Sequence, residues 1–74
     1  MTINIIYHKD YNSQAYSLKA AIIERWSDMS VNMIAINDQL GGAKYQVQME
    51  RDIVSRSDSP VNNTTVINLI EERL

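Results

Sequence analysis

The spacing of apolar residues changes three times along this chain, and these changes limit the order of its secondary structure. In residues 2–7 every second position is β-branched or aromatic, which predicts a strand with Ile3, Ile5 and Tyr7 on one side. In residues 13–28 the apolar positions instead lie three or four apart, which predicts a helix capped by Asn12 or Ser13. The apolar stripe of this helix consists of Ala15, Leu18, Ala21, Ile22, Trp26 and Met29.

After this helix the sequence returns to strand-like patterns. Residues 31–36 form a short β-type run that ends at Asn37-Asp38 and is followed by the turn residues Gly41-Gly42. Residues 44–49 alternate cleanly, so one side of this strand faces a core and the other faces water. Residues 53–57 are predicted to pair with 44–49 as a hairpin. A last helix is predicted over 64–74, capped by Asn62 or Asn63.

The order β-α-β-β-α predicts an α/β (α+β) two-layer sandwich with a mixed four-stranded sheet. The first two strands are parallel, because a helix separates them, and the last two form an antiparallel hairpin. Both helices are expected on one face of the sheet. The expected core is Ile3, Ile5, Tyr7, Leu18, Ile22, Trp26, Tyr45, Val47, Val66 and Ile70.

The opposite face of the sheet is expected to be wet. It carries Asn4, Gln46 and Gln48, although Ile6 and a pair from residues 31–36 would leave an apolar island there. Such an island would serve as a partner surface.

Composition narrows the classes of function. With 74 residues the chain makes one small domain, residues 1–74. It has no cysteine, which excludes disulfides, zinc-thiolate sites, iron-sulfur ligation and thiol catalysis. One histidine cannot build a metal site, so neither a metal nor a cofactor is expected.

Charge and hydropathy limit the classes of partner that this chain is expected to bind. Seven Lys and Arg stand against nine Asp and Glu, and the charges are scattered, so no basic stripe for nucleic acid is expected. The start of the chain shows no basic leader, and no apolar run approaches the ~20 residues of a membrane span. We therefore expect a soluble, cytoplasmic protein with no membrane partner.

Four segments, taken in order, resemble a known family: "INIIY", "SLKAAI", "GGAKYQVQMERDIVSRS" and "VINLIEERL". Together they are similar to the Rdx group of thioredoxin-fold proteins, the selenoprotein W-like family. In that family a strand ending in tyrosine runs into a C-x-x-C or C-x-x-U redox motif. A helix with a Leu-Lys pair, a glycine-strand-hairpin segment and a C-terminal helix follow. The resemblance covers nearly the whole chain and implies a thioredoxin-like fold.

The chain departs from this family at the redox motif. Where the family has C-x-x-C, this sequence has His8-Lys9-Asp10-Tyr11. Thiol-disulfide exchange requires a thiolate that attacks a sulfur, so the redox activity implied by the resemblance is not expected here. The loop before the last helix is also shorter than in the family and lacks its glycine-phenylalanine pair.

The same four residues raise the question of other chemistry. His8, at a strand end that faces a helix start, can act as a general base, with Asp10 as its orienting carboxylate. Residues two apart in a loop, however, seldom hold that contact, and Ser13 is the nearest hydroxyl to consider as a nucleophile. The sequence therefore predicts no catalytic residue: Lys9 and Asp10 are solvated, and Tyr11 packs over the sheet end.

The leading hypothesis is a non-enzymatic module that holds a protein partner, such as an inhibitor or regulator of a larger enzyme, including a virus-encoded one. The candidate partner surface is His8, Lys9, Asp10, Tyr11 and Arg56. One alternative is a small-ligand or anion-binding protein, or an enzyme, that uses the unpaired N–H groups at the start of the first helix. A second is weak RNA binding by a ferredoxin-like domain, disfavoured because Tyr7 and Tyr45 fall on the apolar side of the sheet.

Overall fold

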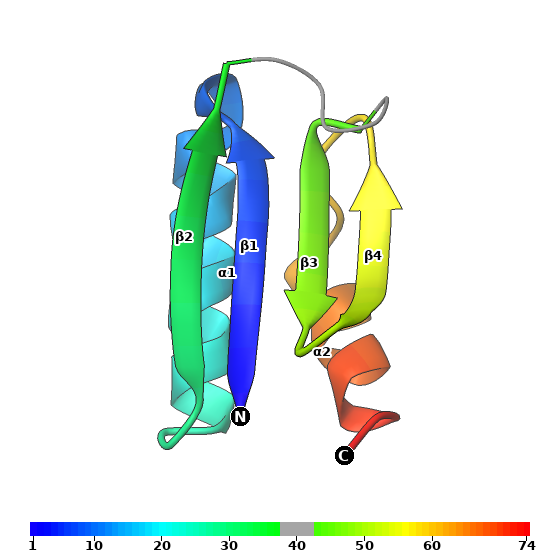
Figure 1. The fold of residues 1–74 in the computed structure, drawn as a ribbon. Helices are drawn as coiled ribbons and strands as arrows, with labels where there is room; N and C mark the ends of the chain where they lie inside the picture. The colour runs from blue at the N-terminus through cyan, green and yellow to red at the C-terminus, as the bar shows by residue number, and fades with distance from the viewer. Residues whose placement is uncertain (38–42) are drawn as a thin grey trace.

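The computed structural model describes residues 1–37 and 43–74. The protein has an α+β fold with one four-stranded sheet and two α-helices (Figure 1). The strands are β1 (Thr2–His8), β2 (Ser30–Ile36), β3 (Tyr45–Met49) and β4 (Asp52–Ser57). The helices are η1, a 3-10 turn (Lys9–Tyr11), α1 (Asn12–Arg25) and α2 (Asn63–Glu71). The turn predicted at Gly41-Gly42 lies outside the described residues.

The strand order is β2-β1-β3-β4, with β1 parallel to β2 and antiparallel to β3. The mixed sheet and the hairpin of β3 with β4 are therefore confirmed. Both helices cover the same face: α1 lies behind β1 and β2, and α2 lies behind β3 and β4 (Figure 1). This arrangement is the two-layer sandwich expected from the order of the elements. In the described part of the chain, no helix is long and apolar enough to cross a membrane.

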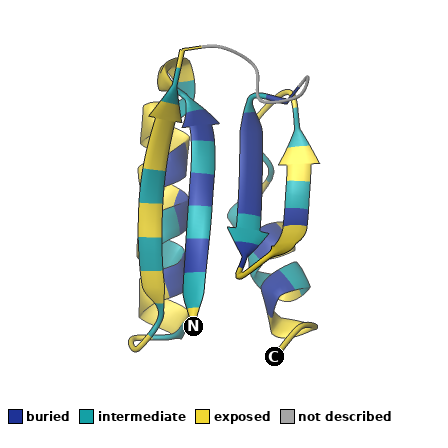
Figure 2. Ribbon diagram, viewed as in Figure 1, coloured by how far each residue is buried: buried dark blue, intermediate teal, exposed yellow. Residues whose placement is uncertain are grey.

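The core lies between the sheet and the two helices. Strand β1 alternates buried and half-buried residues along its whole length (Figure 2), as its sequence predicts. Each large apolar side chain buried in this layer stabilises the fold by about 1.5–3 kcal/mol. Nine of the ten predicted core residues are buried: Ile3, Ile5, Tyr7, Leu18, Ile22, Tyr45, Val47, Val66 and Ile70.

The prediction that α1 extends to residue 28 is wrong, and so is the prediction that Trp26 is fully buried. Trp26 has φ −133° and leaves the helix, and its ring is only partly buried against the core. The N–H of Met29 donates to the Trp26 carbonyl oxygen at 3.0 Å and closes a turn. The apolar spacing continues past Arg25 because Trp26 and Met29 still contact the core from this turn.

The helix starts also differ in part from the prediction. Tyr11 occupies the N-cap of α1, with no side-chain capping bond among the described residues, because η1 precedes the helix directly. Asn12, predicted as a cap, instead accepts a hydrogen bond from the Tyr7 hydroxyl at 3.2 Å. For α2, Asn62 caps as predicted: its Oδ1 accepts from the Thr64 N–H at 2.8 Å. This helix ends at Glu71 rather than at residue 74.

The face of the sheet away from the helices combines polar and apolar residues. The strand register places Ile34, Ile6, Gln46 and Arg56 in one row across it. Ile6 and Ile34 are neighbours there, which confirms the predicted apolar island. The prediction that Gln46 faces water is wrong, since it is only 6% exposed. Its neighbours explain this burial, because Ile6 and the long side chain of Arg56 flank it on either side.

Candidate functional site

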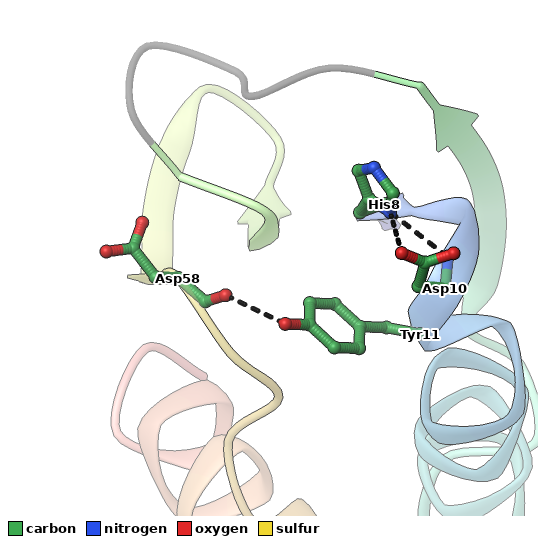
Figure 3. A network of polar contacts seen from close by, with 4 residues as sticks. All are labelled: His8, Asp10, Tyr11 and Asp58. Carbon is green, nitrogen blue, oxygen red and sulfur yellow. Dashed lines mark hydrogen bonds and ion pairs between the residues drawn. The ribbon is translucent and has the colours of Figure 1, made fainter.

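The candidate site lies in the turn that joins β1 to α1. His8 ends the strand with extended backbone angles, φ −67° and ψ 141°. Lys9–Tyr11 then form one 3-10 turn, which is closed by the Asn12 N–H donating to the Lys9 carbonyl oxygen. The strand thus passes directly into the helix at one end of the sheet (Figure 1), and the side chains of His8 and Asp10 lie beside each other there (Figure 3).

The first contact in this turn joins His8 to Asp10. The Asp10 N–H donates to His8 Nδ1 at 3.1 Å, and Asp10 Oδ2 lies 3.4 Å from the same nitrogen (Figure 3). The 3-10 turn thus folds Asp10 back over the imidazole and brings two residues two apart into contact.

The direction of that hydrogen bond decides what the imidazole can do. Because His8 Nδ1 accepts from a backbone N–H, the proton of the neutral ring is on Nε2. In a base-orienter pair the carboxylate accepts from Nδ1–H and leaves Nε2 free to take a proton. Here Nδ1 instead accepts from the Asp10 N–H, so in this arrangement the ring presents a hydrogen-bond donor at Nε2.

Tyr11 ties the turn to a distant part of the chain. Its hydroxyl donates to the Asp58 carbonyl oxygen at 3.3 Å, which joins the start of α1 to the segment after β4 (Figure 3). Its ring packs on the edge of the core and meets the His8 ring edge-on, with 6.3 Å between the ring centroids. The predicted position of Tyr11 over the end of the sheet is confirmed.

The structure gathers four of the five predicted site residues. Lys9 and Asp10 are exposed in the turn, beside His8 and Tyr11. Arg56 lies elsewhere: it pairs with Gln46 on β3, so a whole strand separates it from β1. Arg56 therefore belongs to the open face of the sheet and not to the turn.

Sequence reasoning missed two features near the turn. The first is Asp58, which acts through a main-chain carbonyl oxygen and so leaves no side-chain signature. The second is an open hollow of about 400 Å³ between α1 and the start of α2, which forms only when the two helices meet. The Asn63 amide donates to Ser17 Oγ at 3.0 Å in its wall. The hollow is lined by Ser13, Gln14, Ser17 and residues 60–63.

Within residues 1–37 and 43–74, no group of three or more histidines, aspartates or glutamates is placed to hold a metal ion. Comparisons of the chain with protein-family models, with curated proteins and with solved structures give no match.

Proposed function

We propose that this protein is a non-catalytic recognition module that holds a protein partner through the turn His8–Tyr11. The observation that carries the proposal is that two hydrogen bonds hold this turn in place: the Asp10 N–H donates to His8 within it, and the Tyr11 hydroxyl donates to the Asp58 carbonyl oxygen outside it. A turn held in one shape loses little conformational entropy on binding. Lys9 and Asp10, exposed on it, offer one cation and one anion to a partner.

The arrangement of the same groups argues against catalysis. His8 carries its proton on Nε2, so it lacks the acceptor that a general base needs. Ser13, the nearest hydroxyl in sequence, lines the hollow between the helices rather than the turn. Neither a base nor an activated nucleophile is supported at this junction.

The topology supports the proposed kinship. A parallel β1-α1-β2 unit followed by an antiparallel hairpin and a helix on the same face is the arrangement that the Rdx resemblance implies. We propose a cysteine-free relative of that family in which His8–Tyr11 occupy the place of the C-x-x-C motif. The partner is then a cytoplasmic protein, and regulation of a larger enzyme is the role that fits a module of this size.

The test is affinity capture from the cells that produce the protein, with quantitative mass spectrometry. The test variant exchanges two neighbouring charges, Lys9→Asp with Asp10→Lys, which leaves composition and net charge unchanged. The matched control makes the same kind of exchange in the β3-β4 turn, Arg51→Asp with Asp52→Arg, at the other end of the sheet (Figure 1).

We expect the wild type and the control to enrich the same protein, and the Lys9/Asp10 exchange to lower its enrichment about tenfold or more, as the loss of central charged contacts does. Two results contradict the proposal. One is the absence of any protein enriched by the wild type, and the other is equal enrichment by the wild type and the Lys9/Asp10 exchange.

The hollow between α1 and α2 supports a second candidate, a small polar ligand. Its volume of about 400 Å³ falls within the range of small-molecule sites, and its wall combines the hydroxyl and amide groups of five residues with the apolar surface of Pro60 and Val61. Thermal unfolding with a panel of anions, nucleotides and neutral metabolites tests it. A ligand whose stabilisation is lost in Ser17→Ala supports this candidate, and a panel without any stabilising ligand rejects it.

A further inference from the structure

The two edges of the sheet are protected very differently. Strand β4 carries the charges of Asp52 and Arg56, and its pairing with β3 contains a register shift at Val47/Gln48. Charges and irregularities of this kind keep edge strands from pairing with other chains. Strand β2, at the opposite edge, has neither: its seven residues, "SVNMIAI", carry no charge and no proline, and its register with β1 is unbroken.

Exposed apolar side chains also gather at the β2 edge. Six large apolar side chains are exposed in the described part of the chain, and three of them are Tyr16 at 52%, Ile23 at 38% and Ile34 at 43%. Ile34 is on β2 itself. In Figure 2 most of β2 is exposed or half-buried, whereas β1 beside it alternates with buried residues.

Tyr16 and Ile23 lie on α1, on the other face of the sheet from Ile34, so exposed apolar side chains flank the β2 edge on both faces. The side of α1 that faces α2 is marked by Ser17, bonded to Asn63, and by Arg25, paired with Glu71. At 3.6 residues per turn, Tyr16 and Ile23 lie on the opposite side of the helix, which is the side toward the outer edge of β2.

We propose that two copies of this chain pair through β2, antiparallel about a two-fold axis at Met33, to form one continuous eight-stranded sheet. The absence of charge favours a second copy as the occupant, because a two-fold axis sets a strand against itself and so brings like charges together in a charged edge. Pairing of the full strand places Val31 opposite Ala35 of the second copy, and Ser30 opposite its Ile36.

The helices fit the same axis. Helix α1 contacts both β1 and β2, so it lies over these two strands. With strands about 4.8 Å apart, the two-fold axis brings the α1 helices of the two copies to about 10 Å, which is the spacing of packed helices. The helices then run antiparallel, and Tyr16 of each copy faces Ile23 of the other. The stem of Lys19 can lie along this contact with its ammonium in water.

This inference is independent of the proposed function, because it uses the β2 edge and not the turn His8–Tyr11. The test is the molar mass of the protein by light scattering after gel filtration, at about 100 μM, where a micromolar dimer is nearly saturated. We expect twice the 8.5 kDa of the chain. Ile34→Lys puts an ammonium on the edge strand and, across the two-fold axis, diagonally opposite the ammonium of the second copy, so the dimer dissociation constant is expected to rise about tenfold or more.

Ile53→Lys is the matched control. Ile53 is also an exposed isoleucine, at 48% against 43% for Ile34, but it lies on the other edge strand, β4. The control is expected to remain dimeric, with a circular dichroism spectrum equal to that of the wild type. If Ile34→Lys changes the circular dichroism spectrum, Ile23→Lys on the exposed side of α1 serves as the test variant in its place. The same loss of the dimer is expected.

Cross-linking locates the axis directly, since the natural chain has no cysteine. Directly opposite residues of antiparallel strands have Cα atoms about 5 Å apart, within the range of a disulfide. Met33→Cys is therefore expected to form a disulfide-linked dimer under oxidation, and Ile53→Cys is not. A monomeric wild type, a dimer that survives both Ile34→Lys and Ile23→Lys, or a dimer that only Ile53→Lys dissociates would overturn the proposal.

Discussion

At the scale of a single residue, Tyr45 is a core side chain whose burial has an energetic cost. The side chain is buried between the sheet and the helices, and its hydroxyl has no hydrogen-bond partner among the described residues. A buried hydroxyl without a partner costs about 1–3 kcal/mol. Alternation predicts that Tyr45 faces the core, but the missing partner depends on distances across the helix layer, which a local pattern does not contain.

Removal of this hydroxyl is expected to stabilise the protein. Tyr45→Phe keeps the ring and deletes the unpaired group, so the free energy of unfolding should rise by about 1 kcal/mol at pH 7. Urea unfolding of the wild type and the variant measures this difference. A variant less stable than the wild type would show that the hydroxyl does have a partner in the folded protein.

The same residue predicts how stability depends on pH. Burial raises the pKa of the Tyr45 phenol from 10.0 to about 12. Because the folded protein holds this proton more tightly than the unfolded chain, the free energy of unfolding does not depend on the Tyr45 phenol below pH 10 and falls as the pH rises toward 12. The loss amounts to about 2 kcal/mol by pH 12. Tyr45→Phe should lack this part of the decline, and parallel curves for the two proteins would refute the assignment.

His8 offers a second test at the residue scale. The hydrogen bond from the Asp10 N–H to Nδ1 predicts that the neutral imidazole is protonated at Nε2. Nitrogen NMR of the neutral ring distinguishes the two tautomers. A proton on Nδ1 would instead make the Asp10 carboxylate the acceptor from the imidazole. That result would support His8 as a general base.

At the scale of the element, the cap of α2 resolves a choice that the sequence leaves open between two neighbouring asparagines. Asn62 bonds to the Thr64 N–H, whereas Asn63 reaches across to Ser17. Asn62→Ala should therefore cost about 1 kcal/mol of stability and Asn63→Ala less than about 0.5 kcal/mol. Chemical unfolding of both variants checks the order, and equal or reversed costs would contradict the capping geometry.

The other elements show where periodicity is informative and where it is not. Alternation locates β1 and β3 because the alternate apolar residues of each strand are buried against the helices, although Gln46 on the other face of β3 is buried as well. It misplaces the end of α1, since Trp26 and Met29 still touch the core from a turn. Periodicity indicates which residues are buried, but it does not determine the backbone conformation at those residues. The 3-10 turn at Lys9–Tyr11 was missed for the same reason: it has no buried residue to mark it.

At the scale of the whole molecule, chain connections fix most of the topology. A helical crossover joins parallel neighbours and a short link makes a hairpin, so the pairings β1–β2 and β3–β4 follow from the succession of elements. The pairing of β1 with β3, which completes the order β2-β1-β3-β4, does not follow from it. The candidate site was predictable where its residues are contiguous, as in His8–Tyr11. It was not predictable for Arg56, because β3 lies between β4 and β1 and no local pattern gives that separation.

The turn and the β2 edge are separate surfaces of one molecule, and each can be altered alone. The exchange of Lys9 and Asp10 should leave the molar mass unchanged, because neither residue lies on β2 or on α1. Ile34→Lys should weaken the dimer and still capture the partner. If the Lys9/Asp10 exchange and Ile34→Lys each change both the molar mass and the capture of the partner, the two surfaces are not independent.

The most direct test of recognition by the turn is NMR titration of the ¹⁵N-labelled protein with the captured partner. We predict that the largest backbone shifts fall on residues 8–12 and near Asp58, which Tyr11 joins to the turn. Shifts confined to β2, to the hollow between the helices or to the β3-β4 turn, with residues 8–12 unmoved, would contradict the account.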